Sequence, residues 1–164
     1  MTEATTYQLR NAGGSDAKRI AALAQQLGYP VPVTTVHQRL VLLDPAEHAI
    51  GVAARMKEGV IGWVEVCLEE TLTSGRRCRV TGLVVDQAAR RQGVGRALLG
   101  WAERWARTHG CDELYLTTNE QRQEAHAFYE RLGWHLRKTS HVFAKGAGPL
   151  PALGFPTEEQ RMSR

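Results

Sequence analysis

VVDQAARRQGVGRALL, residues 84–99, carries the strongest structural signal in this chain of 164 residues. It starts at the end of an apolar run typical of a buried strand and passes through a loop with two glycines. It then continues into a segment with the periodicity of an amphipathic helix, which predicts a helix over 94–108. The amides of a first helical turn have no partner within the helix, and the helix dipole makes that end positive. This junction of strand, loop and helix therefore predicts a site for an anion.

The side chains of the loop favour the same interpretation. Gly93 and Gly95 let the backbone approach a phosphate closely, while Arg90, Arg91 and Arg96 add positive charge. The sequence after the glycines lacks the Gly-Lys-Ser/Thr of a Walker loop and the third glycine of a Rossmann fingerprint. The alternative is an ordinary glycine-rich turn into a helix, with arginines that are only solvated.

Hydrophobic periodicity predicts alternating strands and helices on both sides of the loop. Glycines after the apolar runs, at positions 28, 110 and 133, end the expected helices. We expect strands at 7–10, 48–56, 60–68, 76–85 and 113–118, a closing hairpin of 134–138 with 141–145, and helices at 16–27, 35–43, 94–108 and around 125–132. The helix over 94–108 joins two strands, as a right-handed parallel crossover does, so the fold class is α/β with a mixed sheet.

Composition narrows the function classes. The net charge of +4 comes from 21 Lys+Arg and 17 Asp+Glu, and no basic run exceeds two residues, which argues against nucleic acid. Three cysteines without a CxxC pair indicate neither zinc nor a disulfide framework, and we expect no metal. The chain shows no signal peptide and no apolar stretch long enough for a membrane span, so we expect a cytoplasmic protein.

Two motifs together resemble the GNAT acyltransferase family. Arg90-x-x-Gly93-x-Gly95 matches its Q/R-x-x-G-x-G/A signature, and RQEAHAFYERLGW, residues 122–134, is similar to its second signature. The resemblance implies a mixed six- to seven-stranded sheet flanked by about four helices. It also implies a GNAT N-acetyltransferase domain over 1–145, followed by a Gly/Pro-rich extension over 146–164.

The resemblance further implies that acetyl-CoA is the acyl donor. In the family the loop amides bind the pyrophosphate, and the strand before the loop pairs through its free backbone with the pantetheine arm. Many members carry Asn seven residues before the second motif's tyrosine, where this chain has Arg122, so Asn119 is the candidate substitute. The cofactor-binding residues implied are Leu83, Val84, Val85, Arg90, Arg91, Gln92, Gly93, Val94, Gly95, Arg96 and Asn119.

Tyr129 matches the family tyrosine beside the acetyl sulfur, where a phenol can donate a proton to the departing thiolate. The alternative is a core aromatic with a satisfied hydroxyl.

The general base is less well marked, because 79–82, where several members carry a Glu, holds no carboxylate. Glu65 is the candidate, since alternation places it on a strand face with Ile61, Trp63 and Cys67, where apolar neighbours would raise its pKa. His37, His126 and a chain of water molecules are the alternatives.

The expected function is N-acetylation of a primary amine by direct attack on acetyl-CoA. The acceptor is a small molecule or a peptide or protein amine, bound by residues 16–43 and by the loop around 69–77. The alternative is an acyl-CoA sensor module with the same fold and no chemistry. Leu150, Leu153 and Phe155 in the tail favour an arm that covers a partner in a homodimer or folds back.

Overall fold

The computed structural model describes residues 7–146. The described residues as far as Leu116 belong to one compact unit, and those from Thr117 onward belong to a second. This division falls inside the stretch 1–145 that we expected to be one domain. The expected extension, 146–164, lies outside the described residues except for Gly146, and so do Leu150, Leu153 and Phe155.

The first unit is a five-stranded sheet with helices on both faces. Its strands follow the order β1-β2-β3-β4-β5, and all neighbours are antiparallel except β4 and β5, which are parallel. The elements in chain order are β1 (Gln8–Asn11), a 3₁₀ turn (Gly14–Asp16), α1 (Ala17–Leu27), α2 (Val33–Leu42), β2 (His48–Arg55), β3 (Gly59–Thr71), β4 (Gly75–Val85), a 3₁₀ turn (Gln87–Ala89), α3 (Val94–Thr108) and β5 (Glu113–Leu116).

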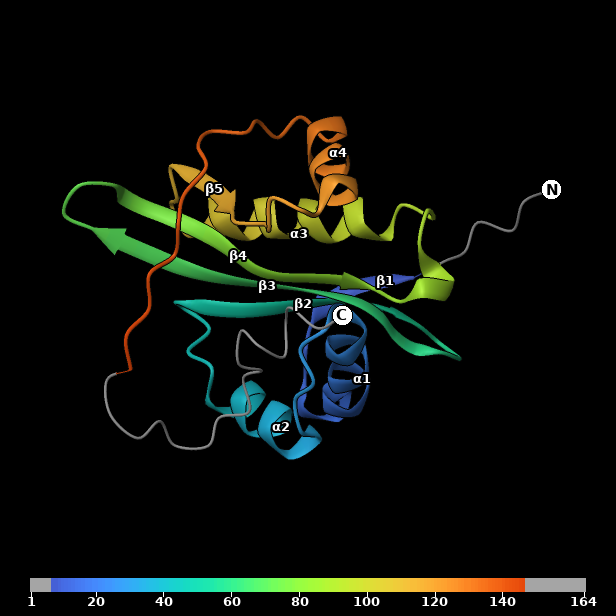
Figure 1. The fold of residues 1–164 in the computed structure, drawn as a ribbon. Coiled ribbons are helices and arrows are strands. Elements are labelled where there is room, and N and C mark those ends of the chain that lie inside the picture. The colour runs from blue at the N-terminus through green and yellow to red at the C-terminus, as the bar shows by residue number, and fades with distance from the viewer. Residues whose placement is uncertain (1–6, 147–164) are drawn as a thin grey trace. The chain divides into compact units, whose positions relative to one another are not determined.

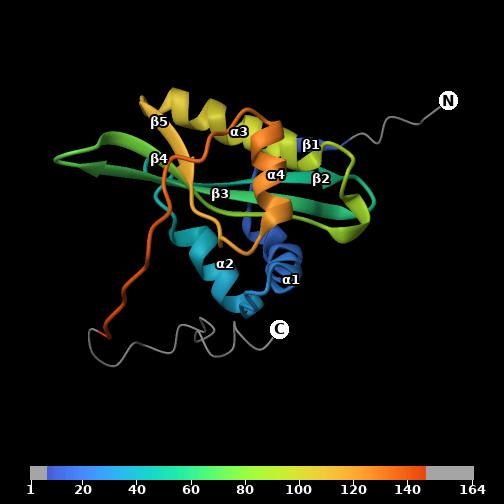
Figure 2. The same ribbon diagram turned by 45° about the horizontal axis from the view of Figure 1, so that its top comes forward.

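Helices α1 and α2 lie on one face of the sheet and α3 lies on the other (Figure 1), and Figure 2 shows the same two layers after a turn. On the first face, Leu23, Val52, Trp63 and Val84 belong to one buried core. On the second face, α3 approaches the sheet closely at Gly51, where an added Cβ would lie 2.6 Å from the Trp101 ring. The helix predicted over 94–108 is therefore confirmed, and packing fixes it against the sheet.

The start of α1 differs in detail from the expected cap. Asp16 precedes the helix, but its side chain accepts hydrogen bonds from the Gly13 amide at 2.9 Å and from Arg10 at 2.6 and 2.9 Å. The carboxylate therefore closes the preceding turn and does not cap α1. At the other end, Gly28 has the left-handed conformation (φ 95°) that ends the helix as predicted.

The second unit contains α4 (Gln123–Arg131), which ends before Gly133 at φ 85°. The prediction of a closing hairpin is wrong, because the described residues after α4, 134–146, form neither helix nor strand. Within residues 7–146 the sheet consequently has five strands and not six to seven. Leu136, Val142 and Phe143 are 79%, 92% and 94% exposed, so this segment buries no apolar face that would stabilise a pair of strands.

Among residues 7–146, no helix is both long and apolar enough to span a membrane.

Candidate functional site

The loop between β4 and α3 has the backbone geometry of an anion site. Gly93 at φ 80° and Arg91 at φ 60° both adopt the left-handed conformation. The first hydrogen bond of the helix runs from the Ala97 amide to the Gly93 carbonyl, so the amides from Gly93 to Arg96 precede it. Left-handed residues next to a helix N-terminus form a concave set of amides that favours negative charge.

The three arginines of this segment differ in their placement. The Arg90 Nε donates to the Val85 carbonyl at 3.2 Å and so turns back toward the strand. Arg91 and Arg96 are exposed, whereas the Val94 side chain is buried and leaves only its backbone for a ligand. The loop therefore combines free amides with exposed positive charge at its rim.

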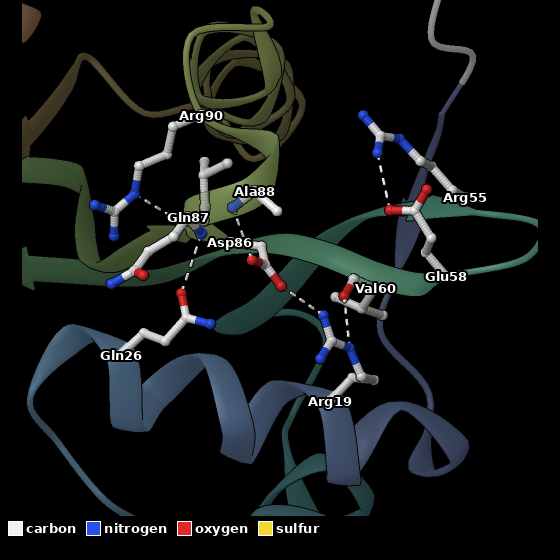
Figure 3. A network of polar contacts seen from close by, with 10 residues as sticks. Arg19, Gln26, Arg55, Glu58, Val60, Asp86, Gln87, Ala88 and Arg90 are labelled. Atoms are coloured by element: carbon white, nitrogen blue, oxygen red, sulfur yellow. Dashed lines mark hydrogen bonds and ion pairs between the residues drawn. The ribbon is translucent and has the colours of Figure 1, made fainter.

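The first half of the loop is supported by side chains of α1 (Figure 3). Arg19 donates from Nη2 to Asp86 Oδ2 at 2.8 Å and from Nε to the Val60 carbonyl at 3.0 Å. The Gln87 amide donates to Gln26 Oε1 at 3.2 Å. Sequence reasoning missed these contacts, since Arg19 and Asp86 are 67 positions apart and no local pattern connects them.

The second half of the loop is supported from β2. Arg55 Nη2 donates to Gln92 Oε1 at 2.6 Å, and Gln92 Nε2 donates to the Ala88 carbonyl at 3.1 Å. Arg55 is also paired with Glu58 of the β2–β3 hairpin at 2.9 Å. Gln92 is thus fixed immediately before the first left-handed glycine.

Strand β4 continues past the point where β5 leaves it. The last parallel pair is Val80 with Leu116, and no described strand pairs with β4 on that side beyond it. A bulge at Thr81 marks the same place on the β3 side, since Val66 pairs with Val80 and Glu65 pairs with Gly82. The end of β4 therefore offers a free backbone edge.

Alternation along β4 decides which residues face this edge. The Asp86 amide donates to the Ile61 carbonyl of β3 at 2.8 Å, so the backbone of Val84 also faces β3, and that of Leu83 and Val85 faces away. The Arg90 side chain bonded to the Val85 carbonyl agrees with this orientation. Val84 is only 4% exposed and packs in the core, so its position suits support of the edge more than contact with a ligand.

Glu65 lies on β3 opposite Gly82, beside the bulge. Its Oε1 is 2.9 Å from His48 Nε2, and its Oε2 accepts a hydrogen bond from Thr81 Oγ1 at 2.8 Å. An added Cβ at Gly82 would lie 3.7 Å from this Oε2 and 2.6 Å from the ring of Trp63. The carboxylate is therefore held at the place where the free edge of β4 begins.

The expected surroundings of Glu65 need two corrections. A bulge at Ile61 interrupts the alternation, so Val60 packs with Trp63 in place of Ile61. Burial raises the pKa of Glu65, but the hydrogen bonds from His48 and Thr81 outweigh it, and the pKa lies below its ordinary value. The expected rise of this pKa is thus wrong, because polar partners that the sequence pattern did not reveal surround the carboxylate.

Glu65→Gln is expected to lower the free energy of unfolding at pH 7 by about 1–2 kcal/mol, since it removes charge-assisted hydrogen bonds. Because the folded pKa is lowered, the carboxylate stabilises the fold above the pKa of an unfolded Glu, about 4.3. That stability is lost as the pH falls through the lowered pKa of Glu65 in the folded protein. The difference in free energy of unfolding between wild type and variant should therefore disappear below about pH 4. Urea unfolding from pH 7 down to about pH 3 measures this difference. Glu70→Gln, at an exposed position of the same strand, is the control. A gap that stays constant down to pH 3 would contradict the assigned pKa direction.

Tyr129 and Asn119 belong to the second unit. The Tyr129 ring packs against Phe128 at 5.3 Å and Trp134 at 5.8 Å between centroids. Burial raises the pKa of the Tyr129 phenol, and Arg122 opposes part of the rise. The phenol consequently keeps its proton at neutral pH.

The two histidines that are alternative bases differ in their surroundings. His126 Nε2 is 3.1 Å from the backbone carbonyl oxygen of Asn119. The side chain of Asn119 accepts a hydrogen bond from the Gln121 amide at 2.9 Å. His37 packs beside Gly14, where an added Cβ would lie 3.0 Å from its Nε2. His126 therefore has a protein partner for its ring nitrogen, whereas His37 is exposed.

Comparison with known proteins identifies relatives. A family model described as "Acetyltransferase (GNAT) family" matches residues 18–134. The chain is 38% identical over 101 residues to aminoalkylphosphonate N-acetyltransferase of Salmonella typhimurium. This alignment covers 61% of the present chain and 62% of that protein. It is 28% identical over 135 residues to aminoglycoside N(6')-acetyltransferase type 1 of Stenotrophomonas maltophilia, which covers 80% and 88%. The chain thus spans less than two thirds of the first relative's length.

A solved structure shows the same fold. The complex of AAC(6')-Iy with the bisubstrate analog CoA-S-monomethyl-acetylneamine aligns at a TM-score of 0.74 and 17% identity, covering 87% of this chain and 99% of that one.

Proposed function

Because the chain belongs to the GNAT acetyltransferase family, we propose that it transfers the acetyl group of acetyl-CoA to a primary amine. The observation that carries the proposal is the junction of β4 and α3, where first-turn amides and a free strand edge adjoin. A pyrophosphate suits the amides, and the amide groups of a pantetheine arm suit the edge. Two relatives named as N-acetyltransferases support the reaction class.

We assign the binding roles to this junction. The amides of Gln92, Gly93, Val94, Gly95 and Arg96 bind the pyrophosphate, with the side chains of Arg90, Arg91 and Arg96 at its rim. The backbone of Leu83 and Val85 pairs with the pantetheine arm, and Val84 supports it from the core. Asn119 remains a proposed contact from the second unit.

In the proposed reaction the amine nitrogen attacks the thioester carbonyl, the C–S bond breaks, and an amide and the CoA thiol are formed. Tyr129 supplies the proton that the departing thiolate takes up, since its raised pKa keeps it protonated. Glu65 attracts the ammonium form of the acceptor. Because its pKa is lowered, Glu65 is a weak base, so the ammonium loses its first proton to water before the nitrogen attacks. The second proton leaves the nitrogen for water as the amide forms, and Tyr129 regains its proton from water.

The acceptor is proposed to lie on the sheet face that carries Glu65. Further along this face, Glu69 pairs with Arg77 at 3.8 Å and with Arg79 at 3.5 Å, and Arg77 lies 4.7 Å above the Tyr115 ring. Charges of both signs favour a polar acceptor. The names of the two relatives indicate different acceptors, an aminoalkylphosphonate for one and an aminoglycoside for the other.

The test is a calorimetric titration with acetyl-CoA followed by an assay of thiol release. The acceptor panel contrasts 2-aminoethylphosphonate, an aminoglycoside, a polyamine and a peptide with a free N-terminus. Micromolar binding with turnover of any amine supports the proposal. Binding without turnover of any acceptor would favour a sensor module, and absence of binding would overturn the proposal.

We also place the protein in the cytoplasm. The support is that its three cysteines, Cys67, Cys78 and Cys111, are all free thiols, as is usual in a reducing compartment.

A further inference from the structure

The loop after β4 contains a conformation that needs support. Arg91 is a non-glycine residue at φ 60°, and such a conformation costs about 1–2 kcal/mol for a residue with a Cβ. Strained backbone of this kind persists where the surrounding structure fixes it. Arg19 and Gln26 contact the first half of the loop (Figure 3), and Arg55 bonds to Gln92 in its second half.

Arg19 joins three elements through one guanidinium. It extends from α1, donates to the Val60 carbonyl of β3, and forms an ion pair with Asp86 at the end of β4. Asp86 Oδ1 in turn accepts from the Ala88 amide at 3.1 Å, which fixes the 3₁₀ turn that follows. Arg19 is the largest cause of the lowered pKa of Asp86, so this carboxylate is charged at neutral pH.

Arg55 acts at the other end of the loop. It holds the Gln92 side chain, which closes back onto the Ala88 carbonyl. The two supported points, Asp86 and Gln92, bracket the strained residue Arg91. The guanidinium groups of Arg19 and Arg55 both bond to protein partners that hold the loop. Each arginine can therefore affect a bound ligand through the conformation of the loop.

We propose that Arg19 and Arg55 are positioning residues that hold the loop in its anion-binding conformation before the acyl donor arrives. The inference rests on the proposed function for the identity of the ligand. Order that exists in the free protein does not have to be created on binding, so these two arginines raise the affinity for a ligand they do not touch.

The chain offers a matched control. Arg10 forms an ion pair with Asp16 at 2.6 Å, and the arginine side chain is 39% exposed, as it is in the pair of Arg19 with Asp86. Both arginines belong to the first unit, but Arg10 does not contact the loop. Arg10→Gln therefore reports the loss of an ion pair as such.

The experiment has one readout with the ligand and one without. Arg19→Gln and Arg55→Gln are each expected to raise the dissociation constant of acetyl-CoA about tenfold in calorimetry, and Arg10→Gln less than about twofold. Without ligand, trypsin should cut after Arg90 or Arg91 about tenfold faster in Arg19→Gln and in Arg55→Gln, here called the support variants, than in Arg10→Gln. Mass spectrometry of the fragments over time measures the rate of cleavage.

The outcomes separate the two proposals. Faster cleavage of the support variants together with weaker binding of acetyl-CoA supports the inference. If the wild type binds acetyl-CoA and both variants bind it equally well with unchanged cleavage, the arginines only tie α1 and β2 to the fold, and the inference is overturned. If cleavage accelerates but the wild type does not bind acetyl-CoA, the positioning role stands and the proposed function fails.

Discussion

Gly93→Asp is expected to raise the dissociation constant for acetyl-CoA at least about 100-fold, which corresponds to about 2.7 kcal/mol. Gly93 has φ 80°, and an added Cβ would meet no atom within 4 Å, so the effect does not come from a steric clash within the protein. The carboxylate would stand at the helix N-terminus, where the amides are proposed to bind the pyrophosphate. Two like charges about 4 Å apart repel by about 4 kcal/mol at an effective dielectric constant of 20.

Helix α3 supplies its own control for this variant. Gly110, just beyond its other end, has φ 66° and also has no atom within 4 Å of an added Cβ. Gly110→Asp brings the same strain and charge, and it is expected to change the dissociation constant less than about twofold. The free energy of unfolding of Gly110→Asp should fall at least as much as that of Gly93→Asp, because a negative charge is unfavourable at a helix C-terminus. Equal loss of binding in both variants would place the pyrophosphate elsewhere, and Gly93→Ala separates strain from charge.

What the sequence predicted well is what depends on near neighbours in the chain. The helix predicted over 94–108 has those limits in the structure, because the apolar stripe and the glycines on either side are local signals. The orientation of Leu83 and Val85 toward the free edge, by contrast, follows from alternation only once the Asp86 hydrogen bond to β3 is known, and their pairing with a cofactor stays a prediction.

What it did not predict depends on strand register and on distant partners. The bulge at Thr81 sets which residue of β4 meets Glu65, and the antiparallel pairing of β2 with β3 brings His48 to the same carboxylate. Neither position follows from periodicity, so the pKa of Glu65 was expected to move in the wrong direction. The closing hairpin failed for a related reason, since its apolar residues, such as Phe143, found no buried face.

Tyr129→Phe is expected to lower kcat by about 10²–10⁴-fold, the usual contribution of a general acid. The variant keeps the ring packing with Phe128 and Trp134, so the free energy of unfolding should change little. Tyr29→Phe, which removes the hydroxyl of another half-buried tyrosine, is the matched control, with kcat expected within about twofold of wild type.

The pH dependence of kcat distinguishes an acid from a packing residue. Burial raises the pKa of Tyr129, so the proton-bearing form persists above pH 10, the ordinary value of a tyrosine, and the wild-type kcat should fall only as the pH rises through that raised pKa. Tyr129→Phe should have a low kcat without this fall, because no group is left to lose the proton. If the variant keeps both the wild-type kcat and its decline at high pH, the proton for the thiolate comes from water or from another side chain, and Tyr129 serves the packing of the second unit alone.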